Sequence, residues 1–168
     1  MIYIGIDNGT SGSIGIIDDA TGGGNSIFKL TPTFKEQSYT KSKKIISRIN
    51  VVELEALLNT YAVPVPTAKV IMERPMVNPG RFMATVSALR ALEATLIVVE
   101  RLKLPRQYID SKQRQKEQLP QGLKGSDELK KASCDIGCRL FPQHAEIISK
   151  HKDADGLLIA EYCRRVKA

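Results

Sequence analysis

The chain has 168 residues, of which 42% are hydrophobic, and a formal net charge of +7. The length suits one domain over residues 1–168 and is too short for two large lobes, while the hydrophobic content excludes wholesale disorder. We expect no membrane span and no signal segment, because no apolar run is expected to reach about 20 residues and nothing cationic and apolar precedes Ile2. These features predict a soluble intracellular protein.

The first part of the chain is predicted to form an antiparallel meander of three strands. Apolar runs over residues 2–7 and 12–18 flank a glycine-bearing turn. A second turn at 21–25 leads into a third strand at 26–30. Residues 31–44 are polar and rich in lysine, so we expect them to form a surface connection.

Helices then alternate with two shorter strands. Asn50 is expected to cap a helix whose apolar residues are spaced by three and four. A strand at 69–73 precedes a long helix that ends before Pro105, with an apolar stripe formed by Leu89, Leu92, Leu96, Val99 and Leu102.

The last third of the chain carries a short strand and two predicted helices. The strand covers residues 108–110, and the basic segment 111–125 is expected to be mobile. Ser126 is suited to cap a helix that ends near Phe141, and the final helix is expected over 153–165. The resulting order of elements predicts an α/β domain with a mixed sheet.

Three acidic side chains stand at the edges of apolar elements. Asp7 ends the first strand, Glu73 ends the strand at 69–73, and Asp155 lies near the start of the final helix. If they converge, two carboxylates about 4 Å apart repel by about 4 kcal/mol at an effective dielectric near 20. Mg²⁺ or Mn²⁺ would relieve that repulsion, and two such ions support phosphodiester cleavage. Alternatively, Asp7 caps a turn, Glu73 pairs with Arg74 or a lysine, and Asp153 or Asp155 caps a helix.

The segment that leads into the final helix offers two further candidates. Asp153 and Asp155 would lie about 200° apart around a helix, so Asp153 would act as the N-cap while Asp155 faces the site. If the first turn unwinds, both aspartates can reach a metal. His151 is four residues before Asp155 and is a candidate ligand or acid–base group.

The positive charge is unevenly distributed, which is typical of proteins that bind nucleic acid. One basic stretch has a single opposing acid, Glu36, and a second basic stretch covers residues 101–131. The first consists of Lys35, Lys41, Lys43, Lys44 and Arg48.

The cysteines argue against a disulfide framework. Cys134, Cys138 and Cys163 are an odd number, which predicts reduced thiols in a reducing compartment. Cys134 and Cys138 can share a helix face, and without a second pair we expect a structural role for them instead of a zinc site.

Together the acidic motifs resemble those of the RuvC-like Holliday junction resolvases of the RNase H superfamily, especially the phage and organellar branches. The resemblance covers nearly the whole chain and is strongest at the final motif, Ala154-Asp155-Gly156-Leu157-Leu158-Ile159-Ala160. It implies an RNase H-like five-stranded mixed sheet, with a three-stranded antiparallel meander plus parallel strands, flanked by helices. It also implies symmetric, divalent-metal-dependent nicking of four-way DNA junctions by a homodimer.

The resemblance assigns metal-site positions to Asp7, Glu73, Asp155 and a residue three or four before the last. That place holds Lys152 or His151 here, which leaves the fourth ligand open between His151 and Asp153.

It also implies a set of DNA contacts. An apolar side chain shortly after Glu73, either Met76 or Phe82, would wedge into the junction; Phe82 would otherwise pack on the following helix. The implied phosphate contacts are Arg74, Asn78, Arg81, Lys112, Lys116, Lys124, Lys130 and Lys131.

Other functions fit parts of the pattern. The segment from Gly5 to Ser11 resembles the first phosphate loop of sugar kinases and other actin-like ATPases, but those proteins need a second lobe. A catalytically silent nucleic-acid-binding module would leave the carboxylates unexplained. A nuclease of the same superfamily that acts on RNA–DNA hybrids or flaps is a further alternative.

Overall fold

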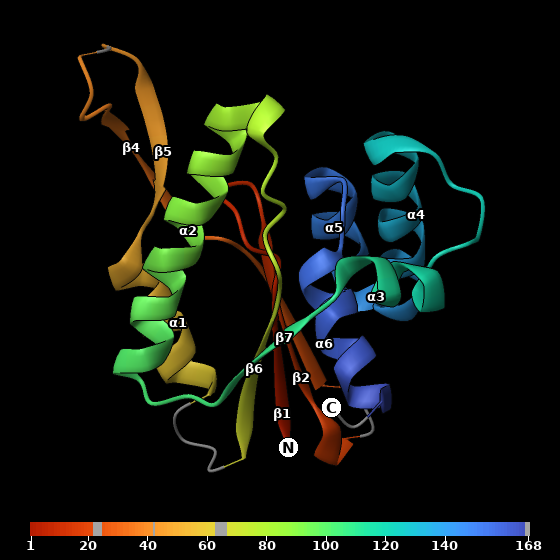
Figure 1. Cartoon of the computed structure of the whole chain (residues 1–168). Coiled ribbons are helices and arrows are strands. Elements are labelled where there is room, and N and C mark those ends of the chain that lie inside the picture. Colours follow the sequence, from red (N-terminus) through yellow and green to blue (C-terminus); the bar gives the residue numbers. More distant parts are fainter. Residues whose placement is uncertain (22–24, 42, 63–66, 167–168) are drawn as a thin grey trace.

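A mixed five-stranded sheet forms the centre of the computed structural model, which describes residues 1–21, 25–41, 43–62 and 67–166 (Figure 1). Its strands lie in the order β3-β2-β1-β6-β7. Neighbours among β1, β2 and β3 are antiparallel, whereas β1, β6 and β7 run parallel. This topology confirms the predicted sheet. The bounds are β1 Ile2–Ile6, β2 Ser13–Asp18, β3 Asn25–Leu30, β6 Ala68–Glu73 and β7 Arg106–Ile109.

Helices cover both faces of the sheet (Figure 1). The helices α1 and α2 pack on the face to which Ile4 and Ile6 point, and α6 packs on the face of Tyr3 and Ile71. Strand alternation explains the two cores, since successive residues of β1 point to opposite faces. The helices are α1 Val51–Tyr61, α2 Phe82–Arg101, α3 Ser111–Gln118, α4 Gly125–Leu140, α5 Ala145–His151 and α6 Asp155–Val166. Single 3-10 turns lie at Asp19–Thr21, Pro79–Arg81 and Pro142–His144.

Glycines bring α6 into direct contact with the sheet. A methyl group at Gly5 would overlap the carbonyl oxygen of Gly156, and one at Gly15 would overlap the backbone of Leu157. The backbone N–H of Gly156 also donates to Ser13 Oγ at 3.1 Å. The start of α6 is therefore fixed against β1 and β2 by contacts between backbones.

Several helix boundaries match the sequence analysis and one does not. Asn50 caps α1, and its side chain accepts a hydrogen bond from the N–H of Glu53 at 3.3 Å. The helix α4 begins at Gly125, so Lys124 occupies the cap position that was predicted for Ser126. The predicted apolar stripe of α2 included Leu89, but the side chain of Leu89 is 42% exposed. Ala91 is one of the residues that α2 buries.

Four elements were missed by the sequence analysis: β4, β5, α3 and α5. The predicted connection at 31–44 contains β4, Thr33–Gln37, which pairs with β5, Ile45–Ile49, in a separate hairpin. Both strands are largely exposed, so they lack an apolar alternation. The predicted mobile segment contains α3, which has no apolar stripe and begins where Asp110 Oδ1 accepts from the N–H of Gln113 at 3.0 Å. The helix α5 was also not predicted. Residues 22–24, which belong to the predicted second turn, lie outside the described part of the chain.

One segment corrects the expectation that no apolar stretch approaches the length of a membrane span. Among the described residues, the helical stretch Pro79–Arg101 is long and apolar enough by length and composition, with a mean hydropathy of 1.7 in its most apolar window. Arg90 and Glu93 interrupt the run without making it polar on average. The core helix of a soluble protein can pass the same test, although only 22% of this window is buried. The helix contacts α1 and β5.

The cysteines are free thiols, as predicted. Cys163, on α6, is buried in the core between that helix and the sheet, and the side chains of Cys134 and Cys138 pack against the same core.

Candidate functional site

Three aspartates converge at one end of the sheet. Asp7 directly follows β1, and Asp153 and Asp155 stand at the start of α6. One carboxylate oxygen from each lies within 4.8 Å of the other two. The N–H of Asp7 donates to the carbonyl of Ser13 at 2.9 Å, so the loop after β1 is held beside the strand that also anchors α6.

The connection between α5 and α6 explains how both aspartates reach the cluster. Lys152 has a left-handed backbone, with φ of 71°, and ends α5. Asp153 precedes the first turn of α6, where its Oδ1 lies 3.4 Å from the N–H of Asp155. The 200° separation therefore does not apply, and the geometry is that of the unwound alternative.

His151 lies behind Asp153 and contributes no atom to the cluster of three. Its Nε2 is 3.4 Å from Asp153 Oδ1, an ion-pair distance if the ring is protonated, but it is not aligned for a hydrogen bond. The side chain is only 11% exposed and its ring centroid lies 6.1 Å from that of Phe28. This position allows His151 to orient Asp153.

Glu73 ends β6 as predicted but is joined to the aspartates by a cation. The guanidinium of Arg114, on α3, donates to Glu73 Oε1 and lies 3.3 Å from Asp155 Oδ1. A third contact at 3.3 Å runs from Arg114 to Gln118 Oε1. The Arg114 side chain is fully buried. Glu73 thus has a cationic partner, but it is Arg114 and not Arg74 or a lysine, the partners that the sequence analysis considered.

Ser133, on α4, supports the same aspartates. Its hydroxyl donates to Asp155 Oδ1 at 2.8 Å and accepts from the N–H of Ala154 at 3.1 Å. Sequence reasoning missed Ser133 and Arg114, because neither stands beside an acidic motif or in an apolar pattern. The one available signal for Arg114 was its position in a basic segment.

The acids raise one another's affinity for protons. Burial, followed by the charges of Asp155, Asp153 and Glu73, raises the pKa of Asp7 to about 7. The pKa of Asp153 is raised by burial and by Asp155, and burial also raises the pKa of Glu73 although Arg114 opposes the effect. Three close carboxylates with this excess of negative charge fit a divalent cation with a preference for oxygen ligands.

A hollow of about 370 Å³ opens beside Asp7 and Glu73. Four of the residues implied as DNA contacts line it: Arg74, Met76, Asn78 and Arg81. The remaining lining residues come from the loops after β1 and β6, from α2 and from α3, and they are Asn8, Pro75, Ala84, Thr85, Ala88, Ser111 and Gln115.

The side chains in this hollow are held to different degrees. Asn78 Oδ1 accepts from the N–H of Gly80 at 2.9 Å, so the amide oxygen caps the turn before α2. Arg74 stacks over the ring of Tyr108 at 5.5 Å. Met76 is 77% exposed. Phe82, 68% exposed, does not line this hollow and does not pack into the core.

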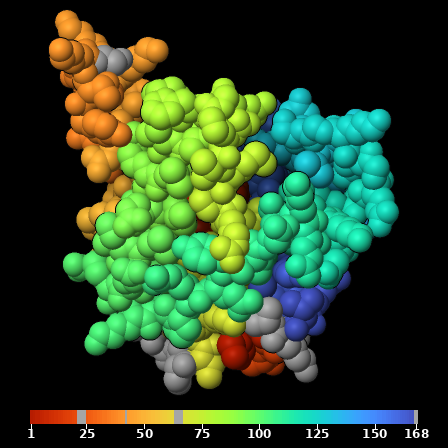
Figure 2. All heavy atoms as spheres, in the orientation of Figure 1, coloured from red at the N-terminus to blue at the C-terminus, as the bar shows by residue number. Residues whose placement is uncertain are grey.

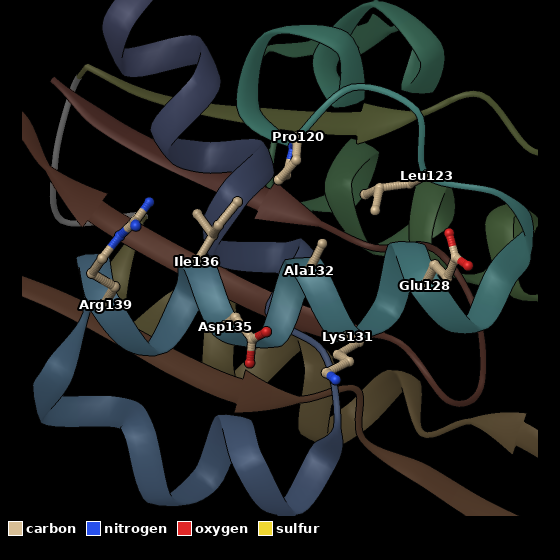
Figure 3. Close-up of a pocket in the computed structure, with 8 residues that line it drawn as sticks. All are labelled: Pro120, Leu123, Glu128, Lys131, Ala132, Asp135, Ile136 and Arg139. Atoms are coloured by element: carbon tan, nitrogen blue, oxygen red, sulfur yellow. The ribbon is translucent and has the colours of Figure 1, made fainter.

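The five implied lysines lie on the exposed surface of α3, α4 and the segment between them. Lys130 is close enough to Asp153 to lower that group's pKa, against the effect of burial. Lys131 borders an apolar groove of about 360 Å³, where Pro120 and Leu123 face α4 (Figure 3). None of the five implied lysines lines the hollow beside Asp7: Lys112, Lys116, Lys124, Lys130 and Lys131.

Comparison with known proteins identifies the fold. No protein-family model and no curated protein sequence matches the chain. Among solved structures, RuvC of T. thermophilus in complex with Holliday junction substrate matches with a TM-score of 0.55 and 14% identity, covering 99% of this chain and 96% of that chain. A second Thermus thermophilus RuvC structure matches at 0.51 and 15%, covering 99% and 97%. At these identities the similarity establishes architecture, and the chain has the RNase H-like fold of RuvC.

Proposed function

We propose that this protein is a divalent-metal-dependent endonuclease that resolves four-way DNA junctions. The observation that carries the proposal is the cluster of Asp7, Asp153 and Asp155 beside a hollow lined by Arg74 and Arg81. The fold shared with RuvC, which one solved structure holds with Holliday junction substrate, supports the choice of DNA substrate.

The three aspartates would hold Mg²⁺ or Mn²⁺. Glu73 would be a further ligand through the carboxylate oxygen that does not accept from Arg114. A cation bound there supplies Lewis-acid stabilisation of charge on the scissile phosphate. Burial and the neighbouring carboxylates raise the pKa of Asp7 to about 7 in the metal-free site, so cation binding near neutral pH would displace a proton from Asp7. Arg114 holds Glu73 and Asp155 in place and balances part of their charge.

DNA would bind through charge at the rim of the site. Arg74 and Arg81 would contact phosphates, and Lys130 would extend the positive surface past Asp153. Met76 and Phe82 are both exposed and follow Glu73, which suits either as the wedge that opens the junction.

We further propose that the chain acts as a single nuclease domain and pairs into a homodimer, so that two sites nick symmetric strands. The apolar side chains that α2 exposes support such a pairing: Phe82, Met83, Leu89 and Ile97.

The test is a nicking assay on a synthetic four-way junction in Mg²⁺, with linear duplex, RNA–DNA hybrid and ATP hydrolysis as comparators. We expect paired nicks near the crossover that Asp7→Asn abolishes. The matched control is Asp19→Asn, which removes one acid beyond the opposite end of β1. Full junction cleavage by Asp7→Asn would refute the proposal, and ATP turnover without nicking would favour the actin-like alternative.

A further inference from the structure

The β4–β5 hairpin is separate from the central sheet and stands out from the body of the protein (Figures 1 and 2). All five residues of β4 are exposed, and in β5 only Ile49 is buried. A two-stranded ribbon is marginally stable by itself. The exposed hairpin therefore needs stabilising contacts from other parts of the chain.

That support comes from α2. Arg90 donates to the hydroxyl of Tyr39 at 3.2 Å and to the carbonyl of Ser47 at 3.4 Å, and its guanidinium lies over the Tyr39 ring at 5.8 Å. At the base, the N–H of Asn50 donates to the carbonyl of Pro32 at 2.9 Å. The hairpin is thus anchored at its base and along one side.

Its charge is strongly positive. Residues 33–49 contain five cationic side chains and one acid, Glu36. Glu36 is paired with Arg48 at 2.7 Å, and Arg48 also stacks over Phe34 at 5.6 Å. Since the single acid is already neutralised within the hairpin, the lysines determine the electrostatic potential around it. Lys41 and Lys43 are exposed and place positive charge at the tip.

The hairpin projects from the same end of the molecule as the acidic hollow, on the other side of α2. Ala84, Thr85 and Ala88 of α2 line that hollow, whereas Arg90, about 200° around the helix from Ala88, donates to the hairpin. Asn8, which follows Asp7, donates to the carbonyl of Ala88 at 3.2 Å. In Figure 1 the hairpin projects past the end of the sheet at which β1 and β6 finish.

We propose that this hairpin is an additional DNA contact that lies along a duplex arm outside the crossover, with Lys41 and Lys43 on backbone phosphates. The inference rests on the proposed junction nuclease and adds a binding surface to it. A two-stranded β-ribbon has the width to enter the major groove of about 12 Å. Each five-residue strand spans about 17 Å, or about five base-pair steps. Contacts of this kind raise affinity without selecting sequence.

The experiment measures binding of a junction by fluorescence anisotropy over a salt series. Each phosphate contact contributes about 0.9 to the slope of log affinity against log salt, so Lys41→Gln/Lys43→Gln is expected to flatten the slope by about 2. The control is Lys103→Gln/Arg106→Gln, which removes two charges at the far end of α2 and the start of β7. We expect this control to keep the wild-type slope.

Hydroxyl-radical footprinting of the same complexes locates the contact. The hairpin variant should lose protection on the outer part of an arm and keep it at the crossover. Wild-type nicking with an unchanged slope and footprint in the hairpin variant would overturn this inference alone, whereas a wild-type protein that neither binds nor nicks junctions would overturn the proposed function. Loss of binding to phosphatidylserine vesicles with unchanged DNA binding would assign the hairpin to a membrane surface and also refute the inference.

Discussion

Replacing Asp7 by asparagine should stabilise the metal-free protein while removing its response to metal. At an effective dielectric near 20, two carboxylate oxygens separated by 4.8 Å repel by about 3.5 kcal/mol. The rise in the pKa of Asp7 from 3.8 to about 7 corresponds to about 4 kcal/mol. Burial is the largest cause of that rise and the neighbouring carboxylates come second, and an uncharged asparagine avoids both, so we expect a gain of about 2–4 kcal/mol in the free energy of unfolding of Asp7→Asn at pH 8.

The effect has a defined pH window. Because the folded pKa of Asp7 lies above its unfolded value, the folded state binds the extra proton between about pH 4 and pH 7. Wild-type stability should therefore fall as the pH rises from about 4 to about 7 and level off above that, and the advantage of Asp7→Asn should be smaller at pH 5 than at pH 8.

Urea unfolding at pH 5 and pH 8, in a chelator and in Mg²⁺, measures both consequences. Mg²⁺ should stabilise the wild type most at pH 8 and leave Asp7→Asn nearly unaffected, since a cation that binds only the folded state shifts its stability. A variant less stable than the wild type at pH 8 in chelator would refute the electrostatic reasoning. Asp19→Asn, which loses only a surface pair with Arg164, should show no comparable pH dependence.

Three further substitutions test how the site is supported, each by urea denaturation. Arg114→Met should cost about 3–5 kcal/mol, because it leaves Glu73 without its buried partner; a neutral effect would show that the ion pair does not hold the acid. Ser133→Ala should cost about 1–3 kcal/mol through two lost hydrogen bonds, and unchanged stability would mean that water replaces the hydroxyl. Gly15→Ala should prevent stable folding or shift α6, since the added methyl would overlap Leu157; a wild-type unfolding curve would contradict the close packing.

The sequence predicted the central sheet well because its three middle strands, β2, β1 and β6, are mostly buried. Strand β1 has five consecutive buried residues, and such a run is recognisable without any partner. The position of Asp7 at its end followed directly. The hairpin and α3 escaped prediction for the opposite reason: β4 is wholly exposed, and α3 is held by its cap and by Arg114 instead of an apolar stripe.

The acidic residues of the site were predictable from the sequence, but the residues that hold them in place were not. Asp7, Asp153 and Asp155 lie beside apolar elements, and the structure brings them together. Arg114 and Ser133 come from helices whose approach to α6 depends on long-range packing. No local pattern marks a residue whose role arises only when distant segments meet.

The glycine contacts of α6 determine how the acidic cluster can respond to its own repulsion. The backbones of Gly156 and Leu157 already touch β1 and β2 at Gly5 and Gly15, so the helix cannot shift inward, and the hydrogen bond from Gly156 to Ser13 resists movement outward. A flexible loop could relieve the strain by spreading its carboxylates apart. On this rigid support the carboxylates keep their spacing, and relief comes through the uptake of protons or cations.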